Sequence, residues 1–232
     1  MKNNKTKTIA AALLAGASSG VALAASPPVT HYWPLVKEAK ADNRQSTDAA
    51  HRVLQAARSS ANANIEYYAG LLREHGWGVQ ANYAKATYWY KKAAEQGQVN
   101  AEFHLGYAYQ HAEGVPRNYA KATYWYKKAA EQGSAHAETN LGTAYVKGHG
   151  VPPNVAQAIY WYKKAAAQGY APAENFLGIV YQGQSTYWFI QAAAQGYAPA
   201  EMMLAYAYQH GLGINQSRAK ATYWYKKAKA AE

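Results

Sequence analysis

Apolar and polar positions alternate along most of the chain with the period of an amphipathic helix. In residues 101–111 one side of such a helix carries Ala101, Leu105, Ala108 and Tyr109. In residues 118–133 one side carries Ala122, Trp125, Tyr126 and Ala129. Because apolar residues three and four positions apart form a single buried stripe, the pattern predicts two helices that pack against each other.

Turn signals separate the predicted helices. Gly114 ends the first helix and Gly133 the second, because glycine tolerates the left-handed conformation that closes a helix. Glycine pairs stand at the turn in other units, at Gly76 with Gly78, Gly148 with Gly150 and Gly211 with Gly213. A side chain that can accept the first free backbone N–H groups precedes each second helix. The predicted N-caps are Asn82, Asn118, Asn154 and Ser217.

The helix pair is repeated along the chain. NYAKATYWYKKAAEQG occurs word for word at 82–97 and at 118–133, and weaker copies follow. The spacing of Trp89, Trp125, Trp161, Trp188 and Trp224 is 36, 36, 27 and 36 residues. A fixed period of this length indicates stacked supersecondary units. We assign the units to residues 65–100, 101–136, 137–172, 173–199 (shortened) and 200–232, and we expect the Trp-Tyr pair of each second helix to be buried.

The same register continues upstream of the first full unit. Ser46 occupies the N-cap position of a further second helix, so residues 46–64 predict a half-unit that caps the N-terminal end of the stack. Residues 25–45 are interrupted by proline and mostly polar, and they predict a flexible leader.

Residues 1–24 have the pattern of a secretory signal peptide. Lysines precede an apolar run, and Ala22-Leu23-Ala24 offers a small-residue cleavage site. The sequence therefore predicts an exported protein, periplasmic or secreted, with no membrane span after cleavage. The chain contains no cysteine, which excludes disulfides and thiolate metal sites.

Charge adds an expectation about partners. The net charge of +11 falls to +8 when the signal segment is removed, because that segment holds three lysines and no acid. A basic exported protein attracts anionic polymers such as those of a cell wall, and we do not expect nucleic acid as a partner. The plainer interpretation is a solvated helix face, since much of the lysine belongs to one copied helix.

The units resemble a known family. LG followed by Tyr, then GxGV, KA and WYKKAAEQG at a 36-residue period are similar to the Sel-1-like repeat family, a relative of the tetratricopeptide repeats. The resemblance covers about residues 46–232. It implies an all-α fold, a right-handed α-solenoid of antiparallel helix pairs, and a non-catalytic scaffold or adaptor that binds other proteins.

Two features depart from the family pattern. Cysteine-rich members, some credited with weak β-lactam binding or hydrolysis, staple each unit with a disulfide, and this chain has none. A weak β-lactam hydrolase is therefore the least favoured function. The fourth unit lacks the GxGV turn, the Asn cap and the KA step, so its second helix should be short. This predicts a bend or change of pitch near residues 182–188, unless a tight turn absorbs the deletion.

By analogy with tetratricopeptide solenoids, the first helix of each unit lines the concave surface. Aromatic residues, histidines and one lysine there are candidates for binding a protein or peptide, because they offer apolar area together with a polar tip. The alternative is that Tyr107 and Tyr206 pack between neighbouring first helices. The candidates are Tyr67, His75, Phe103, Tyr107, His111, Lys147, Tyr206 and His210.

A second candidate surface lies on the convex side. A tyrosine precedes each tryptophan and a pair of lysines follows it in the four full units, so stacking would align them into a stripe suited to an anionic glycan, a cell-wall polymer or a membrane surface. The residues concerned are Tyr88, Lys92, Tyr124, Lys128, Tyr160, Lys164, Tyr223 and Lys227.

We predict no catalytic residue, metal or cofactor. His75, His111 and His210 recur at one position, but units stack roughly 10 Å apart, whereas zinc needs donor nitrogens at about 2.0–2.1 Å. Ser217 and Lys220 match the Ser-x-x-Lys of serine β-lactamases, but SDN and KTG are absent.

The sequence predicts an exported scaffold that binds another protein on its concave face, with polymer binding as the alternative. The last stacking face, which lacks a dedicated cap, offers an edge for a dimer.

Overall fold

The computed structural model describes residues 32–40, 44–181 and 186–230, and in these ranges the chain forms helices and turns without any strand. The predicted signal peptide lies outside them. The helices are α1 Tyr32–Ala39, α2 Arg44–Ser59, α3 Ala63–His75, α4 Tyr83–Glu95, α5 Val99–His111, α6 Tyr119–Glu131, α7 Ala135–Lys147, α8 Val155–Ala167, α9 Ala171–Val180, α10 Thr186–Ala194, α11 Ala198–His210 and α12 Arg218–Lys229.

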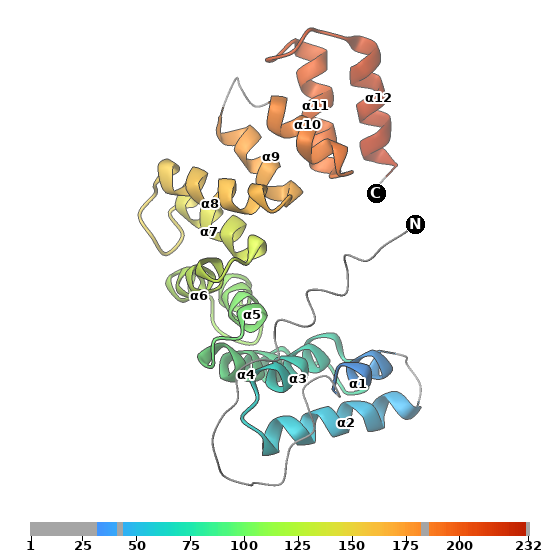
Figure 1. The fold of residues 1–232 in the computed structure, drawn as a ribbon, viewed down its shortest axis with the longest axis vertical. Coiled ribbons are helices and arrows are strands. Elements are labelled where there is room, and N and C mark those ends of the chain that lie inside the picture. Colours follow the sequence, from blue (N-terminus) through green and yellow to red (C-terminus); the bar gives the residue numbers. More distant parts are fainter. Residues whose placement is uncertain (1–31, 41–43, 182–185, 231–232) are drawn as a thin grey trace, which may run out of the picture.

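Consecutive helices pack in pairs, and the pairs stack into an arc. Each odd-numbered helix packs against the helix that follows it, and each pair packs against the next. Figure 1 shows the result along the middle of the chain, where α5 lies on the inner side of the arc and α6 on the outer side. The predicted all-α solenoid of antiparallel helix pairs is confirmed.

Side-chain caps begin the second helices as the sequence predicts. The side-chain oxygens of Asn82 and Asn118 each accept the backbone N–H three residues later at 2.9 Å. Asn154 does the same at 3.0 Å, and Ser217 at 3.3 Å. All four predicted N-caps are confirmed.

Glycine ends the first helix as predicted in three full units, but not in the second full unit. Gly76, Gly148 and Gly211 close α3, α7 and α11 in the left-handed conformation. In the second unit α5 ends at His111, and Ala112 takes this conformation with φ of 64°. Gly114 lies two residues later in the turn, so the expectation that Gly114 ends this helix is wrong.

The core is a series of tyrosines and alanines between the helix pairs. Tyr90, Tyr126 and Tyr162 are buried, and so are Trp89 and Trp161. The tryptophans of the other three units are half-buried. Glycine in the facing first helix makes room for each tyrosine, since a Cβ added at Gly106 would lie only 2.7 Å from the Tyr126 ring. The expected burial of the pair is confirmed in the first and third full units, where the tyrosine is the deeper member. In the second unit only the tyrosine is buried, and in the last unit Trp224 and Tyr225 are both half-buried.

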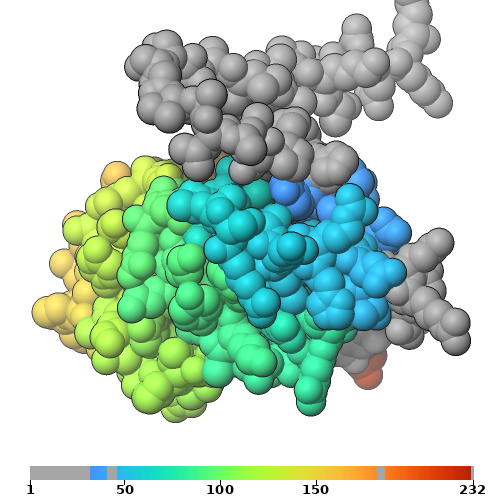
Figure 2. Space-filling model, turned by 90° about the horizontal axis from the view of Figure 1, so that it is seen from below, coloured from blue at the N-terminus to red at the C-terminus, as the bar shows by residue number. Residues whose placement is uncertain are grey.

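The predicted flexible leader contains a packed helix. Within residues 25–45, α1 packs against α2 and α3, and it buries Tyr32, Leu35, Val36 and Ala39. Its apolar residues therefore supply the first helix that the half-unit lacks, which corrects the expectation of a mobile segment at Tyr32–Ala39. The helix α2 begins at Arg44, so Ser46 is a buried residue of its first turn rather than its N-cap. In Figure 2 α1 and α2 form a continuous surface with the helices that follow.

The fourth unit is short, as its nine missing residues predict. Its helices α9 and α10 have 10 and 9 residues, whereas the pair before them has 13 each. Phe189 takes the place of the buried tyrosine and meets Gly178. The sequence predicts a bend at residues 182–188. Residues 182–185 lie outside the described ranges, so the bend stays a prediction.

Candidate functional site

The first helices α5 and α11, which carry predicted concave residues, each have an exposed pair of tyrosine and histidine. Tyr107 and His111 lie one turn apart on α5, with ring centroids 4.1 Å apart. Tyr206 and His210 repeat this arrangement on α11 at 4.3 Å. The two tyrosines are 38% and 47% exposed, so they do not pack between neighbouring first helices. These pairs present flat aromatic surface to solvent on helices whose other side is buried.

Two of the predicted concave residues contribute more to the fold. Tyr67 is half-buried and packs on the core around Tyr90, while Phe103 contacts the rings of Tyr126 and His136. The remaining predicted residues, His75 and Lys147, are exposed at the ends of α3 and α7. The structure thus brings the candidates to the first helices, but it spreads them along the arc rather than into one cluster.

A polar network lies beneath this face between the first two full units. The hydroxyl of Tyr90 donates to Glu74, and Nδ1 of His104 lies 3.4 Å from the same carboxylate. The rings of Tyr90 and His104 stack at 4.8 Å. Burial raises the pKa of Glu74, but hydrogen bonds from His104 and Tyr90 and the nearby histidine charges outweigh burial and lower it. Glu74 is therefore held ionised beside two aromatic donors.

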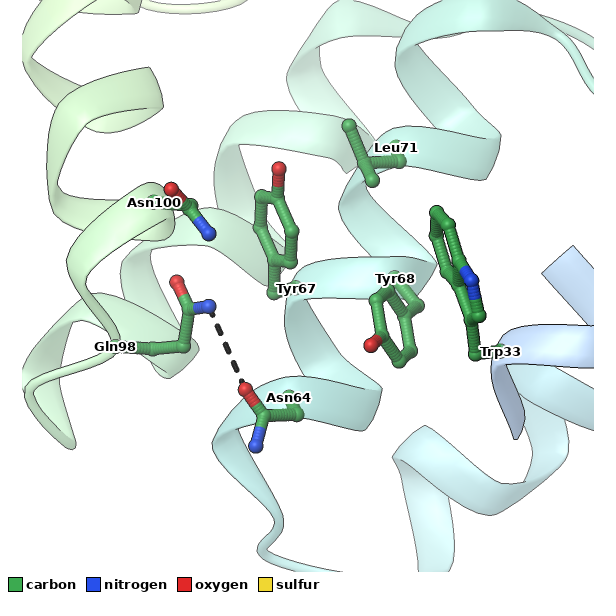
Figure 3. Close-up of a pocket in the computed structure, with 7 residues that line it drawn as sticks. All are labelled: Trp33, Asn64, Tyr67, Tyr68, Leu71, Gln98 and Asn100. Atoms are coloured by element: carbon green, nitrogen blue, oxygen red, sulfur yellow. Dashed lines mark hydrogen bonds between the residues drawn. The ribbon is translucent and has the colours of Figure 1, made fainter. Parts of the chain in front are cut away.

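The same region contains an open hollow of about 540 Å³ between α1, α3 and the start of α5. Figure 3 shows aromatic rings from α1 and α3 on one side and amide side chains on the other. The rings of Trp33 and Tyr68 lie 5.6 Å apart, and Nε2 of Gln98 lies 3.4 Å from Oδ1 of Asn64. The lining residues are Trp33, Asn64, Tyr67, Tyr68, Leu71, Gln98 and Asn100.

Only Tyr67 of this hollow was expected from the sequence as a binding residue. Trp33 was assigned to the leader, and the three amides carry no motif. Asn64 and Asn100 do occupy the same position of successive units, 36 residues apart, and that spacing is the signal that could have found them.

On the convex side the tyrosines of the predicted stripe are all exposed. They are Tyr88, Tyr124, Tyr160, Tyr187 and Tyr223. The second lysine of each pair is engaged within the fold. Lys92 lies 2.8 Å from the buried Glu66, and Lys164 lies 3.4 Å from the buried Glu138. Lys227 repeats this contact at 2.9 Å with Glu201, while the charge of Lys128 acts on Glu102.

These buried glutamates belong to a recurring link between the helices of a unit. A glutamine at the end of the second helix donates to the glutamate of the first, as Gln132 does to Glu102 at 2.7 Å and Gln168 to Glu138 at 2.8 Å. The helical pattern alone does not predict this link, but Glu, Lys and Gln recur at a fixed spacing in successive units, and that spacing is its signal in the sequence. It makes Lys92, Lys164 and Lys227 structural residues as well as stripe residues.

The described residues show no cluster that could hold a metal ion. Within these ranges no three His, Asp or Glu residues converge on a metal-sized space. His75 stacks on Trp77 at 4.3 Å, while His111 and His210 contact the tyrosines of their own helices. Ser217 acts as an N-cap to Lys220. Among the described helices, none has both the length and the apolar character needed to cross a membrane.

Comparison with known proteins decides the family. Five stretches match the Sel1 repeat, at residues 66–98, 99–134, 135–170, 171–197 and 198–232. The chain belongs to the Sel1 repeat family. Members of this family generally mediate protein–protein interactions and are mostly scaffolds without catalysis. No curated protein matches the chain.

Solved Sel1 repeat structures are similar over most of the chain. A Sel1 repeat protein from Oxalobacter formigenes is 31% identical, with a TM-score of 0.79 over 88% of this chain and 82% of that one. A protective antigen of uropathogenic Escherichia coli with the same repeat fold is 30% identical, with a TM-score of 0.76 over 88% of this chain and 46% of that one. An immunity protein from Pseudomonas aeruginosa, 20% identical with a TM-score of 0.55 over 88% and 82%, shares the fold alone.

Proposed function

We propose that this Sel1 repeat protein is an exported, non-catalytic scaffold that holds a partner protein along its concave face. The exposed Tyr-His pairs of α5 and α11 carry the proposal. Tyrosine contributes large contact area at low cost in side-chain entropy, and it keeps a polar tip for hydrogen bonds. The rigid stack of helix pairs behind these rings presents them in a fixed register, which favours recognition of a folded or extended partner.

The proposal is tested by capture of the partner from intact cells. A photo-crosslinking residue at Tyr107 or Tyr206 should give one shared adduct, because the proposal places both residues on the surface that one partner covers. The double variant Tyr107→Ala with His111→Ala should lose capture while its helical circular dichroism is unchanged. Tyr124→Ala is the matched control, since Tyr124 is also exposed but lies on the convex side. Capture that survives the double variant, or that fails equally in the control, contradicts the proposed face.

Export has its own test. The apolar run and the Ala22-Leu23-Ala24 site support cleavage by signal peptidase. Mass spectrometry of the protein from cell fractions should therefore find a mature chain that begins at Ala25, in the periplasm or the medium. An intact Met1 in the cytoplasmic fraction contradicts export.

The exposed convex tyrosines support a second candidate, the binding of an anionic glycan or cell-wall polymer. The available cations are the first lysines of the pairs, because Lys91 and Lys127 only meet exposed glutamates at 3.8 Å. Charge reversal of Lys91, Lys127 and Lys163 should abolish salt-sensitive retention on purified cell wall without loss of stability. Reversal of Lys92 and Lys164 should instead destabilise the protein, because these lysines neutralise buried carboxylates. Retention that does not respond to salt removes this candidate.

A further inference from the structure

The hollow between α1, α3 and the start of α5 is lined by aromatic rings on one side and by amide side chains on the other (Figure 3). One side consists of the rings of Trp33, Tyr68 and Tyr67, which come from α1 and α3 (Figure 3). Trp33 is 41% exposed, and its ring tilts 35° from that of Tyr68. Because aromatic rings present large, flat apolar area, these three rings offer a platform for a ligand with a flat apolar face.

The other side of the hollow is polar but uncharged. Asn64, Gln98 and Asn100 supply side-chain amides, each with a carbonyl acceptor and an NH₂ donor. The side-chain oxygen of Gln98 accepts the backbone N–H of Ala101 and so caps the start of α5. Its Nε2 lies 3.4 Å from Oδ1 of Asn64, and the two contacts hold the amide of Gln98 in place. Asn64 and Asn100 are exposed and face the same space (Figure 3).

Size and charge narrow the class of ligand. A hollow of about 540 Å³ lies within the range of about 300–1,000 Å³ that is typical of small-molecule sites. Among the described residues, no charged side chain lines it. The ammonium groups of Lys37 and Lys40 lie 5.7 and 5.8 Å from the centroid of the Trp33 ring, but neither residue belongs to the lining. A ligand that depends on ion pairs would therefore find no partner in the lining.

We propose that this hollow binds an uncharged oligosaccharide that contains N-acetylated amino sugars. The C–H face of a pyranose ring is flat and apolar and stacks on Trp33 and Tyr68, while its hydroxyl edge hydrogen-bonds to planar amides. An acetamido group presents one donor and one acceptor, and these pair with the complementary groups of Asn64 or Asn100. Burial and the charges of Glu74 and Tyr68 raise the pKa of Tyr67 to about 12, so its hydroxyl stays protonated at neutral pH.

A peptide fits this hollow less well. Pockets that anchor peptide side chains are well packed and exclude water, whereas this hollow is open to solvent and has the amides of Asn64, Gln98 and Asn100 along one side. The inference does not depend on the proposed partner face, because Tyr107 and His111 do not line the hollow. Loss of partner capture through Tyr107→Ala would therefore leave sugar binding intact.

The test is titration of the full mature protein with tri-N-acetylchitotriose, followed by tryptophan fluorescence and calorimetry. We expect saturable binding that quenches or shifts Trp33 emission and that is weaker for cellotriose, which lacks the acetamido groups. Trp33→Ala and Asn100→Ala should each weaken binding about fivefold to tenfold, the size expected for one lost stacking contact or hydrogen bond. Trp33→Phe, which keeps a ring, should retain most of the affinity.

Controls separate binding from folding. Asn100 is exposed, so Asn100→Ala should keep the thermal midpoint of the wild type even if Trp33→Ala loosens α1. Tyr88→Ala removes an exposed convex tyrosine and should leave binding unchanged. The proposal is overturned if chitotriose does not bind, if Trp33→Ala and Asn100→Ala bind it as the wild type does, or if cellotriose binds equally well. It is also overturned if a proline-rich peptide saturates the hollow and the sugar does not.

Discussion

At the scale of single residues, Ala112 is the most strained position in the described backbone. It is the only non-glycine residue with positive φ there, at a place where three other units use glycine. Left-handed backbone costs an L-residue about 1–2 kcal/mol relative to glycine. We therefore predict that Ala112→Gly raises the free energy of unfolding by about 1 kcal/mol, measured by urea denaturation.

The reverse change is the control for this prediction. Gly148→Ala places a Cβ in the same conformation at the end of α7, where φ is 69°. It should lower the unfolding free energy by at least as much, because its Cβ would also meet Pro153 at 2.9 Å. A stability loss in Ala112→Gly would show that the turn of the second unit is not strained.

Glu74 makes a second prediction at this scale, one that depends on pH. Its pKa is lowered in the folded state from an ordinary value of 4.5, so its carboxylate contributes stability above that pH and loses the contribution as the pH falls through the folded pKa. Glu74→Gln should therefore cost about 2 kcal/mol at pH 7, as expected for hydrogen bonds to a charged group, and much less in acid below both values. Chemical denaturation at several pH values measures the difference.

Glu102 is the matched contrast. Burial raises its pKa, although Gln132 and Lys128 act in the opposite direction, so folding destabilises its ionised form relative to the unfolded chain. Glu102→Gln should be neutral or stabilising at pH 7, since a glutamine can still accept from Gln132. If both variants lose the same stability at pH 7, the pKa directions assigned to the two carboxyl groups are wrong.

At the scale of elements, α1 is a short helix that depends on its docking. A helix of 8 residues is not stable alone in water, and α1 is held by apolar contacts with α2 and α3. Val36 is fully buried in this contact. We predict that Val36→Asp undocks α1, because an unpaired charge in this core costs several kcal/mol, and that hydrogen exchange of residues 32–39 then becomes fast.

The rest of the stack provides the internal control. Each unit of a solenoid contacts only its neighbours, so the amides of α7 and α8 should keep their protection in Val36→Asp. Glu38→Gln, at an exposed position of α1, should leave exchange unchanged throughout. Fast exchange of residues 32–39 already in the wild type would restore the flexible leader that the sequence suggests.

At the scale of the whole molecule, the last described stacking face is polar where the inner faces are apolar. In the other four repeat units the same position of the second helix holds a buried alanine, at Ala94, Ala130, Ala166 and Ala193. In α12 this position is Lys229, which is exposed. A lysine at this position would be costly to bury against another helix, so Lys229 opposes the dimer edge that the sequence suggests.

Self-association measures this effect. We predict that Lys229→Ala increases the weight-average mass in sedimentation equilibrium at high protein concentration, because it recreates the apolar stacking position. Lys226→Ala removes a lysine of the same helix without restoring that alanine pattern, and it should not self-associate. A wild type that is already dimeric, with Lys229→Ala unchanged, would contradict the role given to Lys229.

The sequence by itself determined the repeated architecture. The helix pairs, the N-caps at Asn82 and Asn118, the buried Tyr126 and the shortened fourth unit all follow from local patterns, because hydrogen bonding and packing in a solenoid involve only near neighbours. Because one unit is copied several times, the same pattern of caps and apolar positions recurs, and the boundaries of the helices can be predicted from the sequence alone.

Tertiary structure alone decided which side chains of different helices meet. The docking of α1 depends on apolar contacts that its own eight residues cannot encode. The hollow beneath Trp33 combines residues of α1, α3 and α5, and the link from Glu66 to Lys92 joins two helices of one unit. Whether Tyr107 is buried or exposed likewise depends on how neighbouring first helices pack. These features arise from the relative placement of helices, which periodicity along the chain does not specify.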